Sequence, residues 1–295
     1  MKMHDDETHI DVALVQQLVA EQFPALAGLP IQETQSIGTV NAMYRIGKDI
    51  CARLPRSPAG AAALQREARW LPWLAQRLSL RIPEPVDEGR PSASYPFDWA
   101  LYRWIDGAPY SDEAIDDEAQ AARDLAQFVL ELRRLDPSGA PPAGRKPLRR
   151  LDAQTRTAIE AASATIDTSA ALAAWHDALE TAAWAGNPVW IHTDLLRPNL
   201  LVESGRLCAV IDFGSAGAGD PAADVIAAWS VFGPTGRDHF RSALNVDDDT
   251  WRRARGLALH QAALIIPYYS KTNPPFAARA QRTIKQILLD RAQSG

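Results

Sequence analysis

Three polar side chains at the ends of short apolar runs are the residues of this sequence best suited to chemistry. Asp194 and Asn199 lie in a loop after the apolar run 189–191, and Asp212 follows the apolar run 207–211. Polar groups are costly to bury without partners, so strands that end in such residues suggest a site that holds a ligand. Two carboxylates and an amide oxygen are hard oxygen ligands suited to Mg²⁺. A carboxylate that remains free of metal can accept the proton of an attacking hydroxyl.

The elements that must position these residues fall into two parts. Hydrophobic periodicity and turn residues predict a β-rich first part, residues 1–106, behind one leading helix. Its predicted elements are a helix over 11–22, strands over 31–37, 42–46 and 50–54, a helix over 61–78, and strands over 86–88 and 99–104.

The second part, residues 107–295, is predicted to be mainly helical and to carry the catalytic and metal loops. Helices are expected over 116–135, 153–166 and 170–185, a β-rich island over 189–211, and helices from 221 onward. The predicted fold class is therefore α+β, with a small β-rich N-terminal lobe and a larger, mainly helical C-terminal lobe. A cleft between two such lobes is where a ligand is expected.

Composition narrows the class of protein. A net charge of −5 and a pI near 5.7 disfavour a nucleic-acid partner, which usually selects a basic face. Cys51 and Cys208 lie far apart without metal-ligand spacing, which fits a reducing cytoplasm. The polar N-terminus lacks the pattern of a signal peptide, and the apolar stretch 257–269 is too short to span a bilayer. We expect a cytoplasmic protein with neither a nucleic-acid nor a membrane partner, either a monomer or a homodimer.

The segment 192–214 resembles the catalytic and metal loops of the kinase fold. Its residues spell H-x-D-x-x-x-x-N from His192 to Asn199, followed by D-F-G from Asp212. The continuation G-D-P-A-A-D, which ends at Asp224, resembles the aminoglycoside phosphotransferase family rather than protein kinases. The resemblance implies a two-lobed protein-kinase-like fold. It also implies transfer of the γ-phosphate of ATP or GTP, with Mg²⁺, to a hydroxyl of a small molecule such as an aminoglycoside-like antibiotic or a related metabolite.

The resemblance also implies roles for individual residues. Asp194 would be the catalytic base or hydroxyl-orienting group, and Asn199 and Asp212 would hold Mg²⁺. Arg197, which departs from the family's usual loop, has two interpretations. It stabilises charge on the transferred phosphoryl group as a catalytic residue, or it pairs with an acid of the helical part.

Supporting roles follow for three further residues. His192 leads the loop and is expected to brace it. Asp224 matches the helix aspartate that ties down the backbone of the catalytic loop in this fold. Asp220, before Pro221, is interpreted as a helix N-cap.

On the nucleotide side, the resemblance points to residues of the β-rich part. The implied nucleotide-binding residues are Ser36, Gly38, Asn41, Arg53, Glu67, Tyr102 and Trp104. Arg53 occupies the strand position where the family presents a lysine to the phosphates, and arginine grips phosphate with a different geometry. Glu67 is expected to pair with Arg53. The segment from Tyr102 to Trp104 matches the hinge, whose backbone would hydrogen-bond a purine of either kind.

Acceptor specificity is expected in the late helices. The candidates are Asp247, Asp248, Asp249, Trp229, His260, Tyr268, Tyr269 and Asn273. The acidic run also has the pattern of a helix start, and the aromatic residues also fit a core. Two alternatives to a small-molecule kinase are considered. A nucleotide-binding pseudokinase is suggested by the altered loop at 193–198, and a protein kinase is disfavoured because no A-P-E segment follows.

Overall fold

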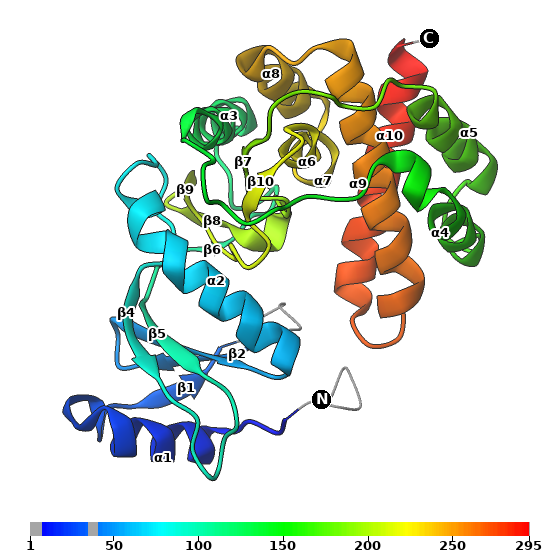
Figure 1. Ribbon diagram of the computed structural model, residues 1–295. Coiled ribbons are helices and arrows are strands. Elements are labelled where there is room, and N and C mark those ends of the chain that lie inside the picture. Colours follow the sequence, from blue (N-terminus) through cyan, green and yellow to red (C-terminus); the bar gives the residue numbers. More distant parts are fainter. Residues whose placement is uncertain (1–7, 35–40, 295) are drawn as a thin grey trace. The chain divides into compact units, whose positions relative to one another are not determined.

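The computed structural model describes residues 8–34 and 41–294, which form two compact units (Figure 1). The first unit comprises residues 1–107 together with the short segment 209–214, and the second comprises residues 108–208 and 215–295. The segment 209–214 includes Asp212, so the expected metal ligand folds with the β-rich unit although its sequence neighbours belong to the helical one.

A five-stranded antiparallel sheet forms the centre of the first unit, in the order β1-β2-β3-β5-β4. The elements of this unit are α1 (Val12–Gln22), η1 (Pro24–Leu26), β1 (Ile31–Glu33), β2 (Asn41–Ile46), β3 (Ile50–Pro55), α2 (Pro58–Ala75), β4 (Pro85–Gly89) and β5 (Trp99–Arg103). The first of these strands is shorter than the sequence indicates, and the remainder of its predicted range lies largely outside the described residues.

The two faces of this sheet have different partners. Side chains alternate between the faces of a strand. Tyr44, Leu54 and Trp99 therefore share one face, where they form a buried core with Leu18 of α1. Arg53 is the neighbour of Leu54 and points to the opposite face, where it hydrogen-bonds Glu67 of α2. The alternation of side chains along β3 therefore places one buried cation, Arg53, on the side of the sheet that faces α2.

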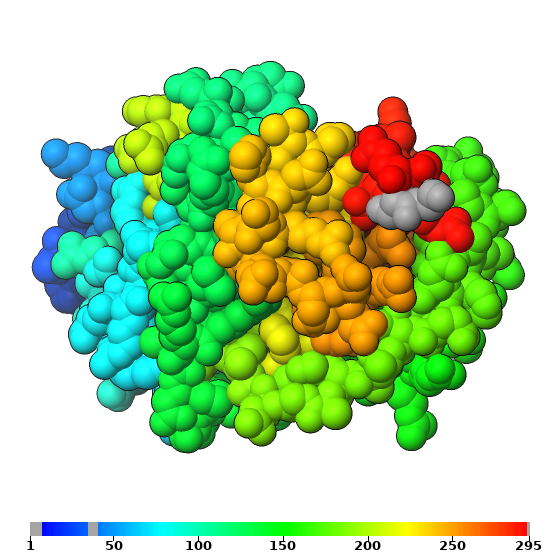
Figure 2. Space-filling model, turned by 90° about the horizontal axis from the view of Figure 1, so that it is seen from above, coloured from blue at the N-terminus to red at the C-terminus, as the bar shows by residue number. Residues whose placement is uncertain are grey.

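The second unit is built mainly from helices. They are α3 (Glu118–Arg134), α4 (Leu148–Ala161), α5 (Thr168–Leu179), α6 (Ala222–Val225), α7 (Ala227–Ser230), α8 (Pro234–Leu244), α9 (Asp248–Tyr269) and α10 (Pro274–Ser294). The long helices α9 and α10 pack along one another, and α4 and α5 pack against α9 (Figure 1). Helix α8 packs along α3, and Figure 2 shows the two side by side on one face.

Short strands in this unit frame the loop that carries Asp194. They are β6 (Ala108–Pro109), β7 (Val189–Ile191), β8 (Leu200–Glu203), β9 (Arg206–Val210) and β10 (Gly217–Gly219). Strand β7 pairs with β10, and β8 lies between β6 and β9. The loop therefore starts at the end of β7 and returns through the short helix η2 (Arg197–Asn199) into β8.

The structure confirms the predicted fold class. A small antiparallel sheet characterises one unit, and helices dominate the other. Within the described ranges, no helix has both the length and the hydropathy required to cross a bilayer.

Candidate active site

In the first unit, one buried arginine gathers two carboxylates and an amide, a group that we call the Arg53 cluster. Nη1 of Arg53 donates to Oε1 and Oε2 of Glu67 at 2.6 and 2.7 Å, and Nη2 donates to Oδ1 of Asp212 at 3.0 Å. With its amide oriented to satisfy both groups, Asn41 accepts from Nε and Nη2 of Arg53 at 3.0 Å. The predicted pairing of Glu67 with Arg53 is confirmed.

Burial and attraction compete within the Arg53 cluster. Burial favours the uncharged form of Arg53, but the adjacent Glu67 and Asp212 outweigh it and raise the pKa of the guanidinium. Burial raises the pKa of Glu67 to about 7, while the attraction of Arg53 acts in the opposite direction. The two short contacts and the raised pKa of Arg53 favour a charged pair. With both acids ionised, the cluster carries one positive and two negative charges.

Asp212 is the accessible member of the Arg53 cluster. Its side chain is 45% exposed, whereas that of Glu67 is enclosed. Its backbone lies in the left-handed region, with φ at 70°, which few residues other than glycine adopt. Strain of this kind persists where the surrounding structure enforces it, and such positions concentrate at functional sites.

The remaining nucleotide-binding predictions have different outcomes. Ser36 and Gly38 lie outside the described residues. Tyr102 is buried on β5. Nε1 of Trp104 donates to Oδ1 of Asp106 at 2.8 Å, and the backbone N–H of Trp104 donates to the carbonyl of Asp49 at 2.8 Å. Because the backbone N–H of Trp104 is already used, a purine bound along this segment would have to hydrogen-bond other backbone groups of the predicted hinge.

In the second unit, the carboxylate of Asp194 is held by two amides. Gln261 of α9 donates to its Oδ1 at 2.7 Å, and Nδ2 of Asn199 donates to its Oδ2 at 2.9 Å. Nδ2 of Asn199 also donates to the backbone carbonyl of Asp194 at 2.9 Å. Because both donors are neutral, they orient the carboxylate without neutralising its charge. The structure therefore fixes the orientation of Asp194 and leaves it an acceptor.

The same contacts identify the atom of Asn199 that is suited to a metal. Its nitrogen is used twice by Asp194, so its oxygen is the atom directed elsewhere. Amide and carboxylate oxygens fit Mg²⁺, which takes few protein ligands and completes its shell with water and phosphate. The oxygens of Asn199 and Asp212 are donors of this kind. The described residues contain no group of three or more His, Cys, Asp or Glu arranged to hold a metal.

A buried aspartate anchors the catalytic loop by accepting hydrogen bonds from its backbone. Asp224 accepts hydrogen bonds from the backbone N–H of His192 at 3.0 and 2.9 Å and from that of Thr193 at 2.7 Å. Thr193 has φ at 75°, so this anchor holds a strained turn just before Asp194. Nδ1 of His192 accepts from the backbone N–H of Asp194 at 3.3 Å. The predicted bracing roles of Asp224 and His192 are confirmed.

Arg197 faces an acid of its own unit. Its Nη1 and Nη2 contact the two oxygens of Asp112, its Nε donates to the carbonyl of Val231 at 2.8 Å, and its guanidinium lies 5.2 Å from the ring centroid of Tyr110. Of the two interpretations, the structure bears out pairing with an acid. The guanidinium is thereby committed on three sides to groups that position the loop.

Another cation lies near Asp194. Burial lowers the pKa of Arg145, and the negative charge of Asp194 opposes that effect. The loop that carries Arg145 rests on β10, where a Cβ at Gly217 or Gly219 would lie 2.2 or 2.5 Å from carbonyl oxygens of the 141–143 segment. Glycine is therefore required at both positions. The sequence analysis missed Arg145 because a loop arginine carries no local signal of its partner.

Most of the predicted acceptor residues serve the fold. His260 is buried and hydrogen-bonds Oγ1 of Thr155 at 2.8 Å, and Trp229 is buried with its Nε1 3.1 Å from Asp290. Asp247 caps α9 by accepting from the N–H of Thr250, as the helix-start interpretation predicts. Asp247 and these two buried rings therefore serve the fold rather than an acceptor pocket. Gln261, the residue directly after the predicted His260, is the α9 residue that contacts Asp194.

Residues 34–257 match the family model described as "Phosphotransferase enzyme family", which is more than half of the chain. The chain belongs to this family. Its structure is similar to that of the GDP and kanamycin complex of APH(2")-IIia, with a TM-score of 0.72, 20% identity, and coverage of 96% of this chain and 99% of that one.

One further solved structure and one protein sequence are also similar to this chain. The structure of macrolide 2'-phosphotransferase MphH from Brachybacterium faecium is similar, with a TM-score of 0.59, 21% identity, and coverage of 92% of this chain and 97% of that one. "Uncharacterized protein YcbJ" of Bacillus subtilis (strain 168) is 25% identical over 198 residues, which are 61% of this chain. The match spans 62% of that protein's length.

Proposed function

We propose that this protein is a small-molecule kinase, which moves the γ-phosphoryl group of ATP or GTP to an alcohol. The observation that supports the proposal is the way in which the carboxylate of Asp194 is oriented. Gln261 and Asn199 orient this carboxylate by donating to it at 2.7 and 2.9 Å, and neither of these amides carries a charge that would neutralise it. Membership of a phosphotransferase family gives that carboxylate a reaction to serve.

In the proposed reaction, Asp194 orients the acceptor hydroxyl and takes its proton. The hydroxyl oxygen then forms a bond to the γ-phosphorus, the bridging bond to the β-phosphate breaks, and the nucleoside diphosphate leaves. Little covalent chemistry falls to the protein, so positioning and electrostatic stabilisation supply most of the acceleration. The anchor at Asp224 contributes by holding the backbone before Asp194.

We further propose that Asn199 and Asp212 hold Mg²⁺ and that Arg53 meets the phosphates. Bound Mg²⁺ would neutralise charge on the phosphate oxygens. Arg53 would stay in place because Glu67 and Asp212 hold its guanidinium. Two of the similar solved structures hold GDP and ADP, respectively, which supports a nucleotide substrate. We assign Arg197 a positioning role, because Asp112 and Val231 hold its guanidinium.

Neither alternative is favoured by a specific observation. The altered loop that suggested a pseudokinase still presents Asp194 with neutral partners and a nitrogen-bonded Asn199. The family assignment and the absence of an A-P-E segment from the sequence disfavour a protein kinase.

Asp194→Ala tests the proposal. We expect acceptor-dependent formation of nucleoside diphosphate to fall roughly 100- to 10,000-fold, the range for loss of a positioned acid–base group. Nucleotide affinity, measured by calorimetry, should stay near that of the wild type. Asp238→Asn, at an exposed position of α8, is the matched control and should keep full turnover. Full activity of the Asp194→Ala protein would overturn the assignment.

A further inference from the structure

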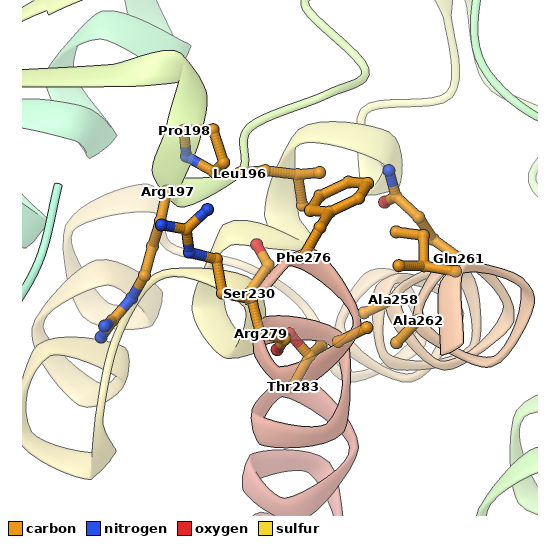
Figure 3. A pocket seen from close by; sticks show the side chains of 12 residues that line it. Leu196, Arg197, Pro198, Ser230, Ala258, Gln261, Ala262, Phe276, Arg279 and Thr283 are labelled. Atoms are coloured by element: carbon orange, nitrogen blue, oxygen red, sulfur yellow. The ribbon is translucent and has the colours of Figure 1, made fainter. Parts of the chain in front are cut away.

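A narrow pocket opens beside Asp194 within the second unit (Figure 3). Its lining comes from the catalytic loop and from helices α7, α9 and α10. Gln261 belongs to this lining and also donates to Oδ1 of Asp194 at 2.7 Å, so the pocket begins one side chain from the proposed catalytic carboxylate. A molecule in this pocket is therefore well placed to present a hydroxyl to Asp194.

The lining is apolar except for a few polar groups. The apolar members are Leu196, Pro198, Ala258, Ala262, Ile265, Phe276 and Ala280. Its charged members are Arg197 and Arg279, and no Asp or Glu occurs among the described residues that line it. In Figure 3, Arg279 enters from α10 and Gln261 from α9, on the two sides of Phe276. An acceptor would meet a cation at one end and the amide beside Asp194 at the other.

Arg279 differs from Arg197 in having an unused donor. The guanidinium of Arg197 is occupied by Asp112 and Val231. Nη1 of Arg279 is enclosed by protein and meets no hydrogen-bond acceptor among the described residues. A buried donor without a partner is costly, and ordered ligands or water usually satisfy such groups. Arg279 lines the pocket, and its guanidinium has a donor that no described residue satisfies.

The surrounding charges leave a positive surplus. Arg197, Arg279 and Arg282, which we call the arginine cluster, have two nearby acids. Asp112 contacts Arg197 and lies 4.0 Å from Arg282, and the negative charge of Glu118 also acts on Arg282. Asp112 itself is 59% exposed. Burial and the charge of Arg197 lower the pKa of both Arg279 and Arg282, as expected when like charges crowd together. A polycationic acceptor would be repelled here, whereas an anion would relieve the crowding.

We propose that the acceptor is a hydroxylated organic anion with an apolar body, of which a hydroxy carboxylic acid is the simplest case, and that Arg279 binds its anionic group. This inference rests on the proposed function, because it names the acceptor of the same site. Arginine suits the task, since its planar fork matches the geometry of a carboxylate. Phe276 and the aliphatic residues of the pocket would cover the chain between the anion and the hydroxyl.

The test compares acceptors of equal length and different charge. Hydroxy acids of increasing chain length, including ω-hydroxyhexanoate, are assayed beside their methyl esters and the corresponding amino alcohols, with kanamycin as a polycation. We expect kcat/KM to be at least about tenfold higher for the best acid than for its ester. In Arg279→Gln that preference should vanish through a rise of about tenfold in KM with kcat nearly unchanged, and Arg279→Lys should restore part of it. Lys285→Gln removes a charge from an exposed position of α10 and should leave the preference intact.

Binding separates this inference from the proposed function. Calorimetric titration of the same acids into the wild type, Asp194→Ala and Arg279→Gln proteins should show binding to the first two and loss in the third. Acids that bind in this pattern without any turnover support the inference and contradict the kinase assignment. Turnover that prefers esters, amino alcohols or kanamycin, or equal behaviour of Arg279→Gln and Lys285→Gln, overturns the inference and leaves the kinase assignment standing.

Discussion

Two groups of buried arginines in this protein carry opposite surplus charge. In the Arg53 cluster, one guanidinium faces two carboxylates, Glu67 and Asp212. In the arginine cluster of the second unit, three guanidiniums have two nearby carboxylates, those of Asp112 and Glu118. A negative surplus suits a group that is to receive a divalent cation, and a positive surplus suits a group that is to receive an anion. The comparison teaches that the balance of charge around an arginine, rather than the arginine itself, indicates which ligand it serves.

The largest effect is expected from removing the surplus acid of the Arg53 cluster. Asp212→Asn leaves Arg53 with Glu67 as its acid, and it weakens the most accessible carboxylate of the proposed metal site. We expect kcat to fall roughly 1,000-fold, because charge on the transferred phosphoryl group loses its stabilisation. The Mg²⁺ concentration needed for half-maximal activity should rise in the same titration.

Glu88→Gln provides the control for that substitution, since it removes an exposed acid of β4 in the same unit. It should change neither kcat nor the Mg²⁺ dependence. If Asp212→Asn behaved like this control, the negative surplus would have no role in metal binding.

A smaller effect is expected from removing the acid of the arginine cluster that contacts Arg197. Asp112→Asn leaves the buried guanidinium of Arg197 without its carboxylate partner, although Val231 still accepts from Nε. Because Asp112 is largely exposed, water replaces part of the lost interaction. We expect the free energy of unfolding in urea to fall by about 1–3 kcal/mol.

A double-mutant cycle with Arg197→Met identifies the cause. If the cost arises from the stranded guanidinium, Asp112→Asn should be nearly neutral in the Arg197→Met background. An unchanged cost in that background would show that Asp112 stabilises the unit through other contacts.

The smallest effect is expected from the protonation of His260, which lies in the same unit as the arginine cluster. Burial, followed by the nearby Arg145, lowers the pKa of His260 to about 4, from about 6.5 in an unfolded chain. A depressed folded-state pKa contributes stability that is complete above the unfolded value. That contribution is lost as the pH falls from about 6.5 toward 4. In His260→Gln, the free energy of unfolding should depend less steeply on pH across this window, by at most about 1.4 kcal/mol per pH unit.

His176→Gln, at an exposed position of α5, is the matched control for this scan. It should retain the pH dependence of the wild type. Parallel curves for His260→Gln and the wild type would exclude a neutral buried His260 as the source of the slope.

The catalytic loop and most of the helices and strands could be predicted from the local sequence. Asp194 and Asn199 were predictable because the loop that presents them is short and its spacing is fixed by the turn between two strands. The pairing of Arg53 with Glu67 was predictable from the family's pattern, and strand alternation explains why that arginine points away from the core of α1. The end of the strand predicted over 31–37 and the full extent of the first unit were harder to predict from the sequence. A strand end depends on pairing, and the segment 209–214 joins the first unit through tertiary contacts.

The pocket proposed for the acceptor could not be predicted from the local sequence. Gln261 and Arg279 lie on different helices, and an arginine on an amphipathic helix is most often a solvated side chain. The aromatic residues and acids that the sequence offered as pocket candidates have the same patterns as core residues and helix caps. Trp229, His260 and Asp247 proved to be of those kinds.

The sequence by itself indicated the class of chemistry, because Asp194, Asn199 and Asp212 stand at the spacing of the kinase-fold loops that the segment 192–214 resembles. Only the tertiary structure decided what surrounds them. The packing of α10 along α9 brings Arg279 into the pocket that Gln261 connects to Asp194, and pairing with Asp112 commits Arg197 to its own unit. Electrostatic character depends on which side chains share a buried space, and that sharing is a property of helix packing rather than of neighbours along the chain.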